Sequence, residues 1–205
     1  FNHRIVAHSP RGEDVGVNGS PGRAPGLLWK PRGADVGPDG SLYVADSGNM
    51  RGQRFAPDGT LLAVWGGPGR GDGEFGGEFA GYHRGPVDVA VGPDGTVYVA
   101  DDGNQRFQRF SSDGAFIRAW DAWSCPGTPA SVGDPTSPAS AHRALPRVDV
   151  VRATVTMTSW AHVDLVLAAA PDGTVYGGSA AGIGRFTADG RCLGRFSGHG
   201  ISPGY

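Results

Sequence analysis

One polar series that could do chemistry occurs twice in the sequence. Its members are Asp46, Asn49 and Arg51 in the first copy and Asp101, Asn104 and Arg106 in the second. Carboxylate and amide oxygens can bind a metal ion or a polar substrate, but repetition at the same spacing favours a structural role. Asp and Asn side chains bond nearby backbone amides and tolerate left-handed turns, and the Arg can pair with the Asp. We therefore expect these residues to shape turns that recur along the chain.

A second set of candidates does not repeat. It consists of aromatic and basic residues in three segments that precede strand-like runs: Trp29, Lys30, Tyr82, His83, Arg84, Trp160 and His162. His83 and His162 could ligate zinc or calcium, with Asp164 or Asp102 adding an oxygen. No third histidine aligns with them, so the simpler interpretation, which needs no cofactor, makes this set an interaction surface.

The elements that would position these residues are repeats. Residues 31–65 return as residues 86–120 with the same order of signals. Each copy has a Pro-Asp-Gly turn, a Tyr-Val-Ala-Asp run, a Gly-Asn-x-Arg series, a Gln-Arg-Phe run, a second Asp-Gly turn and a final tryptophan. In both copies the second turn aspartate lies 19 residues after the first. Agreement of this kind predicts two copies of one structural unit.

Two weaker copies flank this pair. Residues 160–197 restart the unit but lack the Asn-x-Arg series and end at Phe196 in place of the tryptophan. Asn2-His3-Arg4 opens a partial copy over residues 1–15. The chain therefore holds one partial and three full units.

The period also explains the composition. The 205 residues include 36 glycines and 16 prolines, a share that would favour disorder if it had no period. Asp-Gly between alternating apolar runs is instead a strong hairpin signal. Four short strands per unit, recurring along the chain, predict an all-β fold, a β-propeller built of four-stranded antiparallel blades. This fold places the segments that hold the second set of candidates around one mouth of the central channel.

The repeated series resembles the NHL repeat, which is named for an Asn-His-Leu consensus; Asn2-His3-Arg4-Ile5 is similar to the end of that motif. The resemblance covers residues 1–121 and 160–197 and implies a propeller of the six-bladed type. Relatives of this architecture include amidating lyases and lactonase-like hydrolases that hold a metal in the channel. Some proteins that resemble these repeats bind single-stranded RNA on a basic face.

The chain departs from a complete ring. Its units predict a single domain over residues 1–205 with about 3.5–4 blades, either a small partial ring or a fragment of a six-bladed one. Residues 121–147 interrupt the array with a Pro-, Ser- and Ala-rich segment that we interpret as an inserted loop. Val151–Met157 alternates like an additional strand that has no place in the blade scheme. The glycine-rich segment Gly66–Gly73 leads into no helix, so it predicts a connection between blades and no phosphate site.

Three function classes follow from these features. A non-enzymatic scaffold that binds protein partners, or the rest of the same propeller, ranks first because no complete set of metal ligands aligns. The alternative is a metal-dependent lyase or hydrolase at the channel mouth. RNA binding ranks third, because the 18 basic residues are balanced by 20 acidic ones and a nucleic-acid site needs a basic face.

The remaining signals concern the compartment. No apolar run is long enough to span a bilayer. Asn18-Gly-Ser20 is a glycosylation sequon, the chain begins at Phe1, and it holds a single lysine; together these favour an extracellular location. Cys125 and Cys192 could form a disulfide or remain two free thiols, and their number alone does not decide between the two.

Overall fold

The computed structural model of the protein describes residues 3–76, 85–122, 125, 165–179 and 182–196. Within these residues the chain forms three four-stranded antiparallel sheets and one two-stranded sheet. We call the four-stranded sheets blades one, two and three in chain order, and the two-stranded sheet the half blade. The predicted propeller-type fold is thereby confirmed, with about three and a half blades in the described part of the chain.

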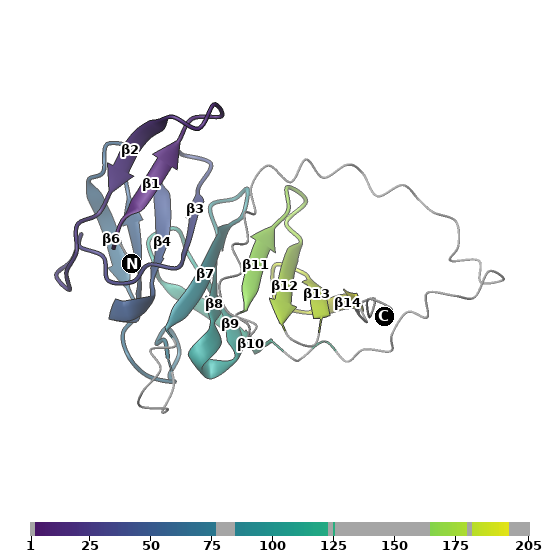
Figure 1. Cartoon of the computed structure of the whole chain (residues 1–205). Helices are drawn as coiled ribbons and strands as arrows, with labels where there is room; N and C mark the ends of the chain where they lie inside the picture. The colour runs from purple at the N-terminus through teal and green to yellow at the C-terminus, as the bar shows by residue number, and fades with distance from the viewer. Residues whose placement is uncertain (1–2, 77–84, 123–124, 126–164, 180–181, 197–205) are drawn as a thin grey trace, which may run out of the picture.

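The strands follow one another across each sheet in the order of the sequence (Figure 1). The half blade consists of β1 (Ile5–His8) and β2 (Asp14–Asn18). Blade one consists of β3 (Gly33–Val36), β4 (Leu42–Asp46), β5 (Arg51–Phe55) and β6 (Leu61–Trp65). Blade two consists of β7 (Pro86–Val91), β8 (Val97–Asp101), β9 (Arg106–Phe110) and β10 (Phe116–Asp121). Blade three consists of β11 (Val166–Ala169), β12 (Val175–Ser179), β13 (Gly182–Phe186) and β14 (Cys192–Phe196).

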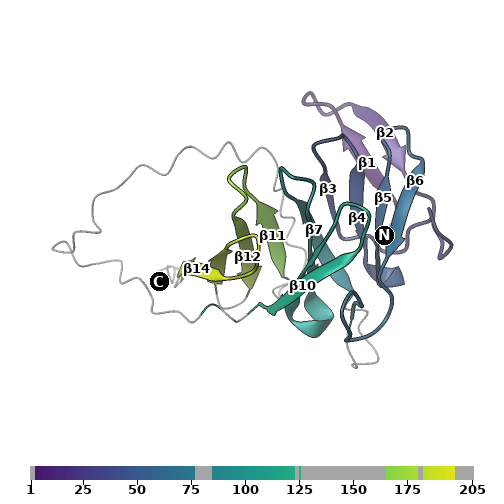
Figure 2. The same ribbon diagram turned by 180° about the vertical axis from the view of Figure 1, so that it is seen from behind.

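The blades are stacked face to face, and the first strands β3, β7 and β11 lie side by side (Figures 1 and 2). Blade two is covered on both faces by its neighbours. Every residue of β8 is therefore buried, and its sequence reads as a continuous apolar run up to its final aspartate. Strand β6 is the last of its sheet and alternates between half-buried and exposed side chains before the buried Trp65. A strand with one solvated face shows such an alternation.

Aromatic side chains fill the spaces between blades. Trp65 and Phe110 are buried between blades one and two, with ring centroids 6.1 Å apart. Trp120 and Phe186 are buried between blades two and three, also with centroids 6.1 Å apart. Tilted aromatic pairs at this separation are favourable beyond the area they bury. Each blade thus supplies one side of a core that it cannot close alone.

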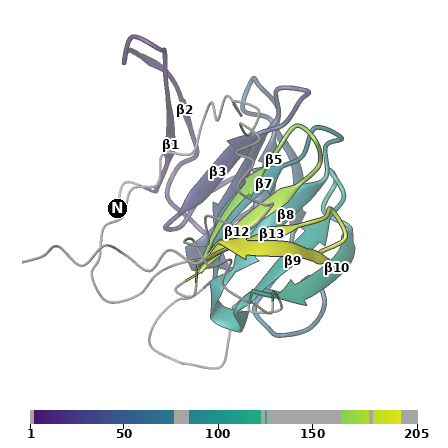
Figure 3. The same ribbon diagram turned by 90° about the vertical axis from the view of Figure 1, so that its right-hand side faces the viewer.

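The half blade has the place of the third and fourth strands of a preceding blade. His3 precedes β1 as Met50 precedes β5 and Gln105 precedes β9, and the three residues share a left-handed φ of 49°, 52° and 55°. These are the middle residues of the Asn-x-Arg series. Figure 3 shows the hairpin of β1 and β2 standing to one side of the overlapping sheets.

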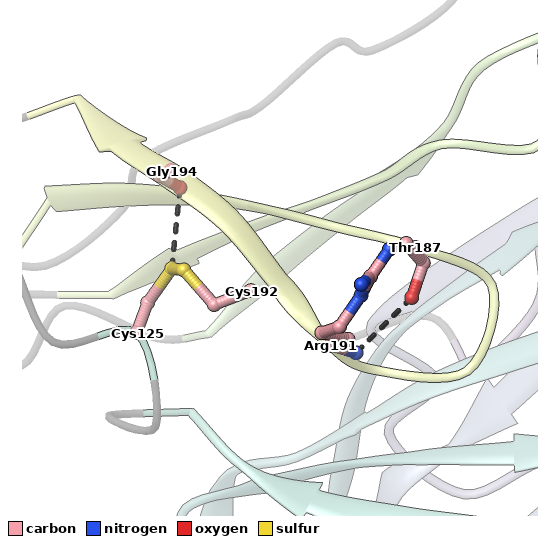
Figure 4. Close-up of a disulfide and its surroundings, with 5 residues drawn as sticks. All are labelled: Cys125, Thr187, Arg191, Cys192 and Gly194. Carbon is pink, nitrogen blue, oxygen red and sulfur yellow. Dashed lines mark hydrogen bonds between the residues drawn. A yellow bond between two sulfur atoms is a disulfide. The ribbon is translucent and has the colours of Figure 1, made fainter.

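Cys125 and Cys192 form a disulfide with a Cα–Cα distance of 5.1 Å (Figure 4). It joins the segment that follows β10 to the first residue of β14. Strand β10 extends to Asp121, the first residue of the segment interpreted as an inserted loop. The rest of that segment and Val151–Met157 lie outside the described residues.

Among the residues that the structure describes, none lies in a helix with the length and hydropathy required to cross a bilayer.

Candidate functional site at the connector face

The connections between successive blades lie at one end of the sheets, which we call the connector face. Connector one, residues 19–32, joins β2 to β3. Connector two, residues 66–85, joins β6 to β7, and the structure describes its residues 66–76 and 85. The short 3-10 helices η1 (Ser47–Asn49) and η2 (Asp102–Asn104) lie at the same end of the blades. The Asp-Gly turns lie at the opposite end, because adjacent strands are antiparallel (Figure 1).

The two connectors are themselves copies of one another. Each carries a Pro-Gly-Arg sequence, at residues 21–23 and 68–70. In each, the proline forms a parallel bridge with a buried apolar residue, Pro21 with Leu28 and Pro68 with Phe75. This repeat is hard to recognise in the sequence, because the connectors are 47 residues apart whereas the blade turns are 55 apart. Additional residues in connector two account for the difference.

The carboxylate of Asp46 fastens connector one to blade one. Its Oδ1 accepts the backbone N–H of Trp29 at 2.7 Å. Its Oδ2 accepts bonds from Asn49 Nδ2 at 2.7 Å, Arg51 Nε at 2.9 Å and Gln53 Nε2 at 3.0 Å. Asp46 is fully buried, and its carboxylate is held by four donors, three of them at Oδ2.

Asp101 repeats the arrangement in blade two. Its Oδ1 accepts the backbone N–H of Gly76 at 2.9 Å. Its Oδ2 accepts bonds from Asn104 Nδ2, Arg106 Nε and Gln108 Nε2 at 2.8, 2.9 and 3.1 Å. Burial raises the pKa of the Asp101 carboxyl above its ordinary value, although these hydrogen bonds oppose the change.

The partners of each aspartate continue into the connector. Asn49 Nδ2 donates to the carbonyl of Gly22 at 3.0 Å, and Arg51 Nη2 donates to the carbonyls of Ala24 and Leu27 at 2.8 and 2.7 Å. In blade two, Asn104 and Arg106 bond carbonyls of connector two in the same way. We call this set of Asp, Asn, Arg and Gln side chains the connector clamp.

The clamp corrects one expectation from the sequence. The asparagines do not themselves adopt the left-handed turn; the next residues, Met50 and Gln105, do. The Asp and Asn side chains bond one another and reach connector residues 17 to 35 positions earlier in the chain. Gln53 and Gln108 also belong to the clamp, and their repetition in the Gln-Arg-Phe run was the available signal.

Two of the expected binding residues, Trp29 and Lys30, lie at the end of connector one. The Trp29 ring stacks on His3, with centroids 4.2 Å apart and an interplanar angle of 18°. The backbone N–H of Lys30 donates to Nδ1 of the same histidine at 2.9 Å. Trp29 and Lys30 are half-buried. The half blade and connector one thus meet through a His–Trp pair on the connector face.

The other expected binding and metal residues lie outside the described part of the chain: Tyr82, His83, Arg84, Trp160, His162 and Asp164. Asp102 is described and is buried, and its Oδ1 accepts a bond from Gln105 Nε2 at 3.3 Å. Among the described residues, no group of three or more His, Cys, Asp or Glu side chains could hold a metal ion.

Two further carboxylates lie on the first strands, and sequence reasoning missed both. Asp35 on β3 accepts the backbone N–H of Val91 on β7 at 2.8 Å. Asp88 on β7 accepts the N–H of Leu167 on β11 at 2.9 Å. Each carboxylate therefore links its blade to the next. Burial raises the pKa of Asp88 to about 6, and the charge of Asp35 adds to the rise, while bonds from Leu167 and Val89 oppose it.

Comparison with protein families and solved structures agrees with this architecture. The NHL repeat matches residues 28–55 and 84–110, which hold all eight clamp residues of blades one and two. No curated protein sequence is detectably similar to the chain.

Several solved structures share the fold. Virginiamycin B lyase from Staphylococcus aureus is 16% identical with a TM-score of 0.51, over 94% of this chain and 48% of the lyase. A protein of unknown function from Bacteroides caccae is 12% identical with a TM-score of 0.55, over 98% of this chain and 57% of its own. Hydrazine synthase from Kuenenia stuttgartiensis is 13% identical with a TM-score of 0.53, over 95% of this chain and 43% of its own.

The chain spans about half the length of these structures. At such low identity the likeness concerns the fold alone. The repeat match, the antiparallel four-stranded sheets and the duplicated clamp agree with one another. The NHL repeat thus matches parts of blades one and two, and the described part of the chain has a propeller-type fold.

Proposed function

We propose that the protein is a non-enzymatic propeller scaffold that presents its connector face to a protein partner. The observation that carries the proposal is that the repeated carboxylates are buried and bonded within the chain. Asp46 and Asp101 are fully buried, and each accepts four hydrogen bonds from its own blade and connector. A fully buried carboxylate that is held by four donors of its own chain is not presented to a metal ion or a substrate from solution.

The same hydrogen bonds make the connectors a rigid binding surface. Because the clamp fixes the connector backbone, little conformational entropy remains to be lost when a partner binds. The outward residues of the connectors include Arg23 and Pro25 in connector one and Asp72 in connector two, and all three are exposed. Loops held by a rigid scaffold are common positions for binding residues.

Cross-linking mass spectrometry with proteins of the source cells tests this proposal. Cross-links to a specific partner should fall on connectors one and two, and the pair of changes Arg23→Glu and Asp72→Lys should abolish them. Asp58→Lys is the matched control, because Asp58 lies in an exposed turn at the opposite end of blade one. Cross-links that disappear in the control and persist in the connector variant would contradict the proposal.

Metal analysis of the purified chain separates the scaffold from the metal-dependent lyase or hydrolase considered above. The scaffold needs no cofactor, so substoichiometric zinc and calcium are expected. One equivalent of either ion, lost in the variants His83→Ala and His162→Ala, would instead support an enzyme whose metal is held by His83, His162 and Asp164.

A further inference from the structure

The two connectors repeat one another in sequence pattern but differ in charge. Connector one contains no acidic residue and three basic ones, which are Arg23, Lys30 and Arg32. Connector two contains two arginines and three acidic residues over residues 66–85. At the positions that follow Pro25 and Leu27 by 47 residues it carries Asp72 and Glu74, and both are exposed. The connector face therefore has positive charge at connector one and an excess of negative charge at connector two.

Hydrogen bonds hold the backbone of connector one at each of its basic residues. The carbonyl of Arg23 accepts a bond from Arg51 Nη1 at 3.0 Å. The N–H of Arg32 donates to the carbonyl of Ala45 at 3.1 Å, and the N–H of Lys30 is bonded as described above. Arg23 and Arg32 are exposed, and Lys30 is half-buried. Connector one thus presents positive charge from a fixed backbone, so little conformational entropy is lost when a partner binds there.

The opposite end of the blades carries the opposite charge. In the described part of the chain, seven turns of five residues each connect adjacent strands at this end (Figure 1). The seven turns hold two arginines and seven acidic residues, six of which are the aspartates of Asp-Gly turns. All six of these aspartates are exposed. An acidic partner is therefore attracted to connector one and repelled from the far end, so the charges set its orientation on the molecule.

We infer that connector one binds an acidic segment of the protein partner, whose carboxylates pair with Arg23 and Arg32. A guanidinium holds a carboxylate through two parallel hydrogen bonds, and two of the three basic residues of connector one are arginines. The inference rests on the proposed function, because it names the chemistry of the partner that the connector face binds.

Single-stranded nucleic acid is a poorer occupant of connector one than an acidic peptide. A base needs an aromatic face on which to stack, and the Trp29 ring is half-buried and already stacked on His3. A nucleic acid carries a negative charge at every phosphate. A strand that crossed the connector face would therefore be repelled by the exposed carboxylates of Asp72 and Glu74. A short acidic peptide that stays on connector one avoids this repulsion and needs no stacking surface.

Binding of fluorescein-labelled hexaglutamate to the intact chain, followed by fluorescence anisotropy at low salt, tests the inference. Arg23→Glu and Arg32→Glu should each weaken binding by about fivefold, because an exposed ion pair is lost and a repulsion takes its place. Arg11→Glu is the matched control, since Arg11 is an exposed arginine in a turn at the opposite end. Affinity that falls as much in the control as in the connector variants, or falls in none of them, would overturn the inference.

A second measurement should show a gain of affinity, which damage to the fold cannot imitate. The pair of changes Asp72→Asn and Glu74→Gln removes negative charge from connector two. The amide oxygen that replaces the carboxylate of Glu74 can still accept the N–H of Gly71, which Glu74 Oε2 accepts at 2.7 Å. At low salt, where charges act over tens of ångströms, the affinity for hexaglutamate should rise by about twofold. An affinity that does not rise would contradict the inferred polarity of the connector face.

Two other occupants of connector one are outcomes of the same experiments. Hexauridylate that binds more tightly than hexaglutamate would assign connector one to RNA, and a dimer of the chain that Arg23→Glu dissociates would assign it to the acidic turns of a second copy. Either result would overturn the inference.

The inference and the proposed function can fail separately. Cross-links from a partner to the connectors, without binding of hexaglutamate, would overturn the inference and leave the proposed function standing. Binding of hexaglutamate that Arg23→Glu weakens, without such cross-links, would support the acidic-peptide site and contradict the proposed function.

Discussion

Blades one and two fasten their connectors with hydrogen bonds, whereas blade three carries a disulfide. The positions of Asp46, Arg51 and Gln53 in blade one are occupied in blade three by Ser179, Gly182 and Gly184, as the strand registers show. The asparagine of the clamp has no counterpart in blade three. Three of the four members of the clamp have been replaced and the fourth is missing, so blade three cannot hold its connector in the same way.

The disulfide lies where the clamp would have been. Cys125 belongs to the segment that leads from blade two toward blade three, and its Sγ is 3.6 Å from the place where a Cβ atom of Gly184 would stand. The same sulfur is 3.2 Å from the carbonyl oxygen of Gly194 (Figure 4). A covalent link to β14 therefore replaces the polar contact made by Gln53 and Gln108. Polar and covalent fastening are two solutions to one requirement, that a connector be fixed to the blade it enters.

Removal of one clamp carboxylate should have the largest effect on stability. Asp101→Ala removes the carboxylate that neutralises the guanidinium of Arg106, whose side chain is 13% exposed. Breaking a buried ion pair in this way costs about 3–5 kcal/mol in the free energy of unfolding, measured by urea denaturation. Asp58→Ala, in an exposed turn, is the control and should change the unfolding curve little. A clamp variant as stable as the control would show that the clamp does not fasten the connector.

Loss of the disulfide should have the next largest effect, confined to blade three. Cys125 and Cys192 are separated by 67 residues, and replacing both by serine should cost about 2–4 kcal/mol, since the unfolded chain then gains freedom. Hydrogen exchange should accelerate in β13 and β14 and stay unchanged in β5. Equal acceleration in blades one and three would mean that the disulfide stabilises the whole stack.

These two fastenings show what the sequence could and could not predict. The blades were predictable because Asp-Gly turns and apolar alternation are local signals with a fixed period. Only the repeated side chains of the clamp could be recognised in the sequence. The carbonyls that they bond lie in the connectors, which repeat after 47 residues whereas the blade turns repeat after 55. Whether Cys125 and Cys192 are paired could not be predicted, because the spacing of two cysteines along a chain does not give their distance in space. Asp35 and Asp88 went unnoticed because they do not occupy equivalent positions in their blades. Asp35 pairs with Tyr43 in blade one, but the residue that pairs with the equivalent Tyr98 in blade two is Ala90.

The metal candidates illustrate a different limit. His83, His162 and Asp164 come from segments outside the described residues, so their expected proximity stays a prediction. Trp29 shows why such segments are hard to assign from sequence. Its ring contact is with His3, a residue of the half blade that occupies the variable position of the Asn-x-Arg series. No periodic signal connects these two residues.

The bonds between first strands predict a pH dependence. The pKa of Asp88 is about 6 in the folded chain, above the ordinary value of 3.8, so the folded state holds this proton more tightly than the unfolded state. Its stabilising contribution is therefore complete below pH 4 and is lost as the pH rises through 6. The loss amounts to about 2–3 kcal/mol.

Asp88→Asn isolates this contribution, because an amide oxygen can still accept the N–H of Leu167. Between pH 4 and pH 7 the wild type should lose about 2–3 kcal/mol in the free energy of unfolding relative to the variant. The turn aspartates Asp39 and Asp94, whose pKa values are lowered, are present in both proteins and cancel. Parallel pH profiles for the two proteins would rule out a proton at Asp88.

The contact of Arg109 with Asp189 should have the smallest effect, and it separates the two kinds of contact between blades. The Asp189 side chain is 73% exposed, so water and salt screen the pair, and Asp189→Asn should cost about 0.5 kcal/mol at low salt. In 1 M salt, where the screening length is about 3 Å, wild type and variant should unfold at the same urea concentration. The buried Trp120 and Gly190 contact at the same turn is unaffected by salt, so it should hold blades two and three together under both conditions. A cost that persists in 1 M salt would show that Arg109 contributes through geometry more than through charge.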